Sequence, residues 1–127
     1  MTDQENLKIS IYATDAQKIC EIEDVKSNYN LEEINILKVV QSESLVSMEV
    51  RYFSIEGLEN FRNLVELDLS CNKISFLTGM DNLHDLRFLD LSCNQLTNLD
   101  GLGNLFNIEK IILSHNKISS LKGLQNV

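Results

Sequence analysis

The stretch LVELDLSCNKISFL at residues 64–77 is followed by a near-copy, LRFLDLSCNQLTNL, at residues 86–99. The second copy begins one 22-residue period after the first, and a weaker third copy begins at Ile108. A fixed period of this length is the signature of stacked structural units, because an ordinary globular domain does not repeat itself in this way. With 127 residues, of which 43% are hydrophobic, the chain is long enough to build one core from such units.

The period places the same residue type in column after column. The apolar columns are Leu64, Leu86 and Ile108; Leu67, Leu89 and Ile111; Leu69, Leu91 and Leu113; Ile74, Leu96 and Ile118; and Leu77, Leu99 and Leu121. An asparagine column holds Asn72, Asn94 and Asn116, and a glycine column holds Gly57, Gly79, Gly101 and Gly123. So many columns in one register do not arise by chance.

Within each unit the apolar spacing changes from two residues to three. Leu67 and Leu69 alternate with polar residues, which predicts a short strand with one buried face. From Ile74 to Leu86 an apolar residue recurs at every third position, which indicates a 3₁₀-like or extended return segment. Since one unit cannot bury its own leucines, we expect the units to stack and their strands to form a continuous parallel sheet.

The asparagine and glycine columns are expected to be structural. Asn72, Asn94 and Asn116 stand where the chain bends away from each strand. A buried asparagine there can bond the backbone groups that a turn leaves unpaired, both in its own coil and in the next one. The glycine column marks backbone positions that a side chain would crowd or strain.

These columns resemble those of leucine-rich repeats, whose pattern LxxLxLxxNxL is matched within residues 64–127. The 22-residue length and the returning pattern xxLxGLxxLxxL are similar to the SDS22-like subclass of that family. The resemblance implies an α/β solenoid that is curved, with a parallel sheet on its concave face and 3₁₀ or extended returns. It also implies that the concave face binds another protein.

Upstream of residue 64 the pattern weakens. Apolar residues from Tyr52 to Leu64 keep the three-residue spacing, so we expect repeats over residues 42–127, with units starting near 42, 64, 86 and 108. In the strand half of the first of these units, Ser47 replaces a leucine and Val50 replaces the asparagine. The stack is expected to be open at its C-terminal end, as in a fragment, a short isoform or the front part of a longer protein.

Residues 1–41 are interpreted as degenerate N-terminal coils or as a cap that contains some helix. Apolar residues and Asn28 between Ile19 and Ile36 have the same spacings as Ile74 through Leu91, which suggests a first unit over residues 9–30. We favour degenerate coils, because the first rung of a solenoid must hide its leucines from water.

The composition argues against several classes of function. The net charge is −8, with 19 acidic and 11 basic residues, which argues against nucleic-acid binding. The acidic excess is steepest over positions 1–44, where we expect a solvated acidic face, with a basic protein partner as the alternative. No stretch is long and apolar enough for membrane insertion.

The cysteines and the first residues bear on the cellular location. The opening MTDQENLK is not a signal peptide, and Cys20, Cys71 and Cys93 form no CxxC pair. We therefore expect a reducing, intracellular compartment. This is the cytoplasm or, as the resemblance to SDS22-like proteins suggests, the nucleus or the cytoskeleton of cilia and centrosomes.

Partner binding must use the residues between the inward-facing leucines. In successive strands these candidates are Glu66 and Asp68; Arg87, Phe88 and Asp90; and Lys110, Ile112 and His115. Phe88 and Ile112 are expected to be exposed as a diagonal apolar pair among charged residues, an arrangement typical of protein interfaces. The alternative interpretation is that scattered exposed apolar residues are normal on any protein surface.

A metal site is not expected. The column Cys71, Cys93 and His115 has the residue types of zinc ligands. Adjacent strands lie about 4.8 Å apart, however, so three such donors form a straight row of roughly 9–10 Å rather than a tetrahedron. A Cys71–Cys93 disulfide is sterically conceivable but is not expected in a reducing compartment.

Neither an enzyme nor a cofactor is expected, since no phosphate-binding loop and no catalytic arrangement around His84 or His115 is recognisable. The sequence predicts an intracellular protein–protein interaction scaffold or regulatory subunit. The alternative is the N-terminal recognition segment of a longer enzyme or signalling protein, with the activity outside this chain. The partner is not identifiable from the repeats, because the shared columns encode the fold alone.

Overall fold

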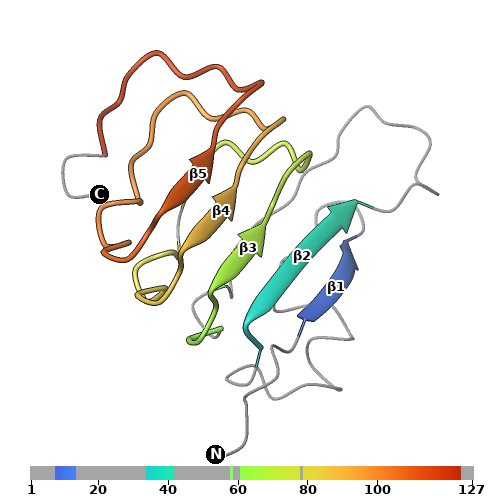
Figure 1. Cartoon of the computed structure of the whole chain (residues 1–127). Helices are drawn as coiled ribbons and strands as arrows, with labels where there is room; N and C mark the ends of the chain where they lie inside the picture. The colour runs from blue at the N-terminus through green and yellow to red at the C-terminus, as the bar shows by residue number, and fades with distance from the viewer. Residues whose placement is uncertain (1–7, 14–33, 42–57, 59–60, 78, 124–127) are drawn as a thin grey trace, which may run out of the picture.

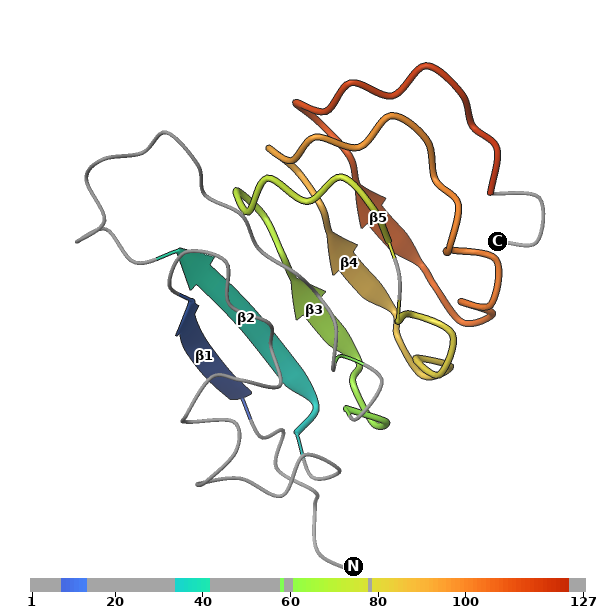
Figure 2. The same ribbon diagram turned by 180° about the vertical axis from the view of Figure 1, so that it is seen from behind.

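The computed structural model describes residues 8–13, 34–41, 58, 61–77 and 79–123, and these form one five-stranded parallel sheet. The strands are β1 (Lys8–Ala13), β2 (Ile36–Gln41), β3 (Glu66–Asp68), β4 (Phe88–Asp90) and β5 (Lys110–Ile112). Their order in the sheet is their order in the chain, so each coil adds one strand beside the last (Figure 1). Figure 2 shows the same five strands side by side from behind. The predicted solenoid is confirmed.

The pairing of the strands reproduces the 22-residue period. Leu67 lies opposite Leu89 in the β3–β4 pair, and Leu89 lies opposite Ile111 in the β4–β5 pair. Leu67 and Leu89 are fully buried, and Ile111 packs against the same core while remaining partly exposed. The central residue of each strand therefore points inward, as the two-residue alternation predicts.

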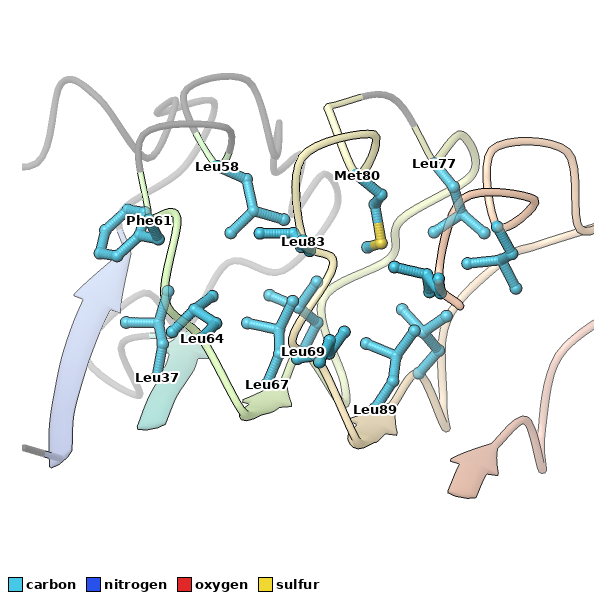
Figure 3. Close-up of a cluster of buried hydrophobic side chains, with 14 of the residues drawn as sticks. Leu37, Leu58, Phe61, Leu64, Leu67, Leu69, Leu77, Met80, Leu83 and Leu89 are labelled. Atoms are coloured by element: carbon cyan, nitrogen blue, oxygen red, sulfur yellow. The ribbon is translucent and has the colours of Figure 1, made fainter. Parts of the chain in front are cut away.

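The core fills the space between the strands and the return segments (Figure 3). Leu67 and Leu89 come from the strands, and Met80 and Leu83 come from a return segment on the opposite side of the core. Main-chain N–H groups donate to carbonyls three residues back along these returns, from Leu83 to Met80 at 3.2 Å and from Leu86 to Leu83 at 3.2 Å. Such bonds place every third side chain on one face, which confirms the predicted 3₁₀-like returns.

The described residues contain no α-helix, so the coils are strand, turn and return throughout. Accordingly, no helix in this part of the chain is long and apolar enough to cross a membrane.

Upstream of β3 the structure differs from the 22-residue expectation. The strand beside β3 is β2, in which Leu37 lies opposite Leu67, so the coil that joins them is longer than one period. The carbonyl of Asn35 accepts hydrogen bonds from the N–H groups of Val65 and Glu66, at 2.7 and 3.1 Å. Ile34 and Leu37 are both fully buried and occupy the positions that Leu64 and Leu67 hold in the next coil.

The sequence alignment of this region was wrong by three residues, because it matched Ile34 with Leu89 instead of with Leu86. A three-residue spacing looks the same when it is shifted by three, so it cannot define the register by itself. The neighbouring strand was expected within a unit starting near residue 42, but β2 ends at Gln41. Residues 42–57 lie outside the described residues, and the unit boundary there stays a prediction.

The segment 1–41 supplies β1 and β2 to the sheet, with Ile9 opposite Leu37. Two parallel strands in sheet order are what degenerate coils would contribute. Residues 1–7 and 14–33, which include most of the expected first unit over 9–30, lie outside the described residues. The choice between coils and a cap for those segments stays a prediction.

Candidate functional site

Two rows of side chains cross the face of the sheet that points away from the core. Asp68, Asp90 and Ile112 lie opposite one another in one row, and Glu66, Phe88 and Lys110 do so in the other. Each residue neighbours an inward-facing leucine or isoleucine in its strand, so both rows project from the opposite, concave face of the solenoid. We call these six residues the concave rows.

The remaining two predicted binding residues lie beyond the concave rows. Arg87 immediately precedes β4, where its carbonyl accepts hydrogen bonds from the N–H groups of Glu109 and Lys110 at 2.9 and 3.1 Å. His115 lies three residues beyond β5, in a turn with a φ of 58°. Both side chains are exposed, at opposite ends of the strands.

Phe88 and Ile112 are less open than the sequence suggested. Both are half-buried rather than exposed, and the Nζ of Lys110 lies 5.8 Å from the centre of the Phe88 ring. A cation over an aromatic face is attracted by the negative face of the ring, so Lys110 partly covers Phe88. Phe88 and Ile112 are therefore partly covered apolar side chains, each in a row that also holds charged residues.

The aspartates of the concave rows also shape the turn that follows each strand. Asp68 Oδ1 accepts hydrogen bonds from the N–H and the Oγ–H of Ser70, at 2.9 and 2.7 Å. Asp90 Oδ1 accepts the same two bonds from Ser92, at 2.9 and 2.6 Å. An aspartate that bonds the backbone two residues on stabilises a turn of this kind. Sequence reasoning missed this role, although an Asp-x-Ser motif recurs with the period.

These turns leave the second oxygen of each aspartate for other partners. Asp68 Oδ2 lies 3.8 Å from the Nζ of Lys38, its partner in the β2–β3 register. Within the described part of the chain, no Lys, Arg or His side chain lies within ion-pair distance of Asp90. Among the residues that the structure describes, the row thus holds one carboxylate beside a cation and, next to it, an oriented carboxylate without one.

The asparagine column joins each coil to the preceding one. Asn94, 6% exposed, donates from Nδ2 to the carbonyls of Leu69 and Leu91 at 2.9 and 3.0 Å. Its Oδ1 accepts from the N–H groups of Asn72 and Ile74 at 3.0 and 2.8 Å. The bonds between coils run back to the coil before, whereas the sequence suggested the coil after.

Asn116 repeats part of this pattern one coil later. Its Nδ2 donates to the carbonyls of Leu91 and Leu113 at 2.8 and 3.0 Å, and its Oδ1 accepts from the N–H of Leu96 at 3.0 Å. Asn116 is half-buried, whereas Asn72 and Asn94 are buried.

The glycine column occupies positions where a side chain would collide with backbone. Gly101 has a φ of 107°, and a Cβ there would lie 2.1 Å from the carbonyl oxygen of Leu77. Gly123 has the same φ, and its Cβ would lie 2.0 Å from the carbonyl oxygen of Leu99. The prediction that a side chain would crowd these positions is confirmed.

The column Cys71, Cys93 and His115 lies in the turns rather than in the strands. All three residues have left-handed backbones, with φ values of 61°, 57° and 58°. Cys71 and Cys93 are free, exposed thiols on adjacent coils. Partial burial of the sulfur, the neighbouring Cys93 thiol and the charges of Asp68 and Asp90 raise the pKa of the Cys71 thiol. Among the described residues, no three His, Cys, Asp or Glu side chains gather as metal ligands.

A family model described as Leucine Rich repeats, in two copies, matches residues 62–104, which contain β3 and β4. A comparison with curated proteins finds no match. The matched segment includes Asn72 and Asn94 and both aspartate–serine turns. Residues 62–104 therefore resemble leucine-rich repeats, and the parallel sheet with its repeated coils is the solenoid fold typical of that family.

Proposed function

We propose that this protein is a protein–protein interaction module that docks a partner on the concave rows. Leucine-rich repeats generally mediate contacts between proteins, which sets the class of function. The residues in the concave rows are the ones that packing leaves available, because the residue between them in each strand is part of the core. The observation that carries the proposal is the carboxylate of Asp90.

The carboxylate of Asp90 is held in place before any partner arrives. Two hydrogen bonds from Ser92 orient Oδ1, and the second oxygen has no cation beside it within the described part of the chain. A group that is already ordered loses little conformational entropy when it binds, so more of its interaction energy contributes to affinity. Asp90 is therefore a preorganised acceptor for a positively charged group.

The neighbouring coil indicates what such a group would be. Lys38 Nζ lies 3.8 Å from Oδ2 of Asp68, the residue beside Asp90 in the same row. We expect an arginine or lysine of the partner to occupy the corresponding place beside Asp90. An apolar side chain next to it would pack on Phe88 and Ile112, which are half-buried. The partner is thus a protein segment with a basic residue beside an apolar one.

This chemistry also bears on the type of partner. With a net charge of −8, the chain would repel the phosphate backbone of a nucleic acid, so the proposed partner is a protein. The same face would serve an SDS22-like scaffold or regulatory subunit in the cytoplasm, in the nucleus or on the cytoskeleton. It would equally serve the recognition segment of a longer enzyme or signalling protein. The size of the endogenous protein, detected with an antibody against residues 62–104, separates these two.

The experiment is an affinity purification from cell extract with three tagged proteins, analysed by quantitative mass spectrometry. The first is the wild type. The second carries Phe88→Ala, Asp90→Asn and Ile112→Ala, where asparagine keeps an Oδ1 acceptor for Ser92 while it removes the charge. The third carries Phe76→Ala and Phe106→Ala, at side chains that are 77% and 64% exposed and lie outside the concave rows.

Specific partners should be recovered with the wild type and with the Phe76→Ala, Phe106→Ala control, and depleted about 10-fold or more with the concave variant. For a partner identified in this way, Asp90→Asn alone should also weaken the dependence of binding on salt, since it removes one ion pair. Equal recovery of every partner by all three proteins, with unchanged circular dichroism, would show that the concave rows are not the docking surface.

A further inference from the structure

Cys71 and Cys93 lie side by side on adjacent coils. Each follows its strand by three residues, after Asp68 and Asp90, which lie opposite each other. The pairing continues beyond the strands: the N–H of Leu69 donates to the carbonyl of Asp90 at 2.9 Å, and the N–H of Cys71 donates to the carbonyl of Ser92 at 3.0 Å. The two cysteines therefore occupy equivalent places on neighbouring rungs.

The backbone has the same local conformation at the two cysteines. Both residues are left-handed, with φ values of 61° and 57°. Neighbouring rungs of a sheet lie about 4.8 Å apart, within the roughly 4.4–6.8 Å that separates the Cα atoms of disulfide-bonded cysteines. Both thiols are free and exposed to small solutes.

We propose that Cys71 and Cys93 are a thiol pair that hydrogen peroxide can close into a reversible disulfide between the coils of β3 and β4. The function proposed above assigns no role to these thiols, so the two proposals fail independently. In a reducing compartment the pair rests as two thiols and becomes a disulfide when peroxide is present.

The chemistry needs only the two thiols and one molecule of hydrogen peroxide. One cysteine loses its proton, its thiolate attacks a peroxide oxygen, the O–O bond breaks, and the leaving hydroxide takes up a proton, which gives a sulfenic acid and one water. Because its surroundings raise the pKa of the Cys71 thiol, this step should become faster as the pH rises. The sulfur of the second cysteine then attacks the sulfenic sulfur, the S–O bond breaks, and a second water leaves with the remaining proton. Two thiols are oxidised to one disulfide, and the peroxide is reduced to two waters.

Closing this bond links two points that are one 22-residue period apart in the chain. A disulfide restricts the unfolded chain, and the rung spacing lies within the Cα separation of natural disulfides. The expected consequence is a solenoid that unfolds at a higher temperature when it is oxidised.

The test uses the full chain and a Cys20→Ser variant, which removes the third cysteine. Each protein is treated with hydrogen peroxide, blocked with an alkylating reagent and mapped by mass spectrometry without reduction. We expect one intramolecular link between the peptides that contain Cys71 and Cys93, reversed by dithiothreitol. The midpoint of thermal unfolding should rise by about 5 °C or more in the oxidised form.

Cys71→Ser and Cys93→Ser provide the matched controls. Because both side chains are exposed, each variant should fold, as circular dichroism can verify, and neither should gain thermal stability on oxidation. Links between chains, links through Cys20 or unpaired sulfinic acids in place of the Cys71–Cys93 link would overturn the proposal. So would an oxidised protein whose thermal midpoint is no higher than that of the reduced one.

Discussion

The coil that carries β4 and the coil that carries β5 have nearly the same pattern of leucines but a different burial. Leu89 and Leu99 are buried in the inner coil, whereas Ile111 is half-buried and Leu121 is 68% exposed in the outer one. Within the described residues, β4 has a strand on each side and β5 has one on a single side. A leucine-rich coil is therefore buried by its neighbours, since its own residues cannot enclose it.

The same difference extends to the polar groups. Asn94 accepts hydrogen bonds from two N–H groups of the coil before it, whereas Asn116 accepts one. Ile112 stands where Asp68 and Asp90 hold the serine turns, so this turn lacks its carboxylate in the outer coil. The comparison predicts that a substitution in the inner coil costs more stability than the equivalent substitution in the outer coil.

The largest expected effect is at the strand centres. Leu89→Ala should lower the free energy of unfolding by about 2–5 kcal/mol, because it opens a cavity in a closely packed core. Ile111→Ala should cost about half as much, since the side chain is already partly exposed. Urea unfolding followed by circular dichroism measures both. Equal losses would mean that β5 is covered as fully as β4.

The glycine column gives the next largest effect. Gly101→Ala should cost about 2–3 kcal/mol, because the new Cβ would collide with the backbone of Leu77 at a φ of 107°. Gly123→Ala should cost less, since the outer coil can shift away from Leu99. Gly103→Ala is the control, because nothing lies within 4 Å of its Cβ, and its unfolding midpoint should not fall. A Gly101→Ala protein as stable as the wild type would contradict the crowding argument.

Substitutions in the asparagine column should lower stability less than those at the strand centres and glycines, and again more in the inner coil than in the outer one. Asn94→Ala should cost about 1–3 kcal/mol, since it leaves the N–H groups of Asn72 and Ile74 without their Oδ1 acceptor in a buried site. Asn116→Ala should cost less, because it serves one N–H group in the preceding coil and is half-buried. Thermal melts of the two variants provide the comparison. An Asn94→Ala melting temperature equal to that of the wild type would show that the asparagine column does not stabilise the fold.

The serine turns give the smallest effect. Ser92→Ala should cost about 0.5–1 kcal/mol, because Asp90 loses the hydroxyl that donates to it at 2.6 Å. Ser114→Ala should change stability by less than about 0.5 kcal/mol, since Ile112 has no carboxylate to bond. Paired chemical denaturation curves can resolve the two. A larger loss for Ser114→Ala than for Ser92→Ala would mean that the turn does not depend on the aspartate.

Part of the fold was predictable because each copy of the repeat provides a check on the alignment of the others. Leu67, Leu89 and Ile111 were aligned by their spacing before any contact was known, and they lie opposite one another in the sheet. Upstream of residue 64 this check is missing, since the coil from β2 to β3 is longer than the 22-residue period and has no second copy. There the three-residue spacing alone gave a register that was wrong by three residues.

The sequence predicted which residues lie on the candidate site, but it did not predict which side chains surround each of them. The two-residue alternation places Phe88, Asp90 and Ile112 on the concave face, whatever their neighbours are. Other features depend on strands that are distant in the chain: Lys110 covers Phe88, and Lys38 pairs with Asp68 while Asp90 lacks a cation in the described region. Whether the concave rows bind a partner stays a prediction until the three purified proteins are compared.

From the sequence alone, the 22-residue period already determined which residues face inward from residue 64 onward, because residue type and spacing are properties of the chain itself. Only the tertiary structure decided how deeply each of them is buried, which strand lies beside β3 and which charges are paired. Burial and pairing depend on neighbours that are close in space but distant in sequence. Two coils with nearly the same pattern therefore differ in stability and in chemistry.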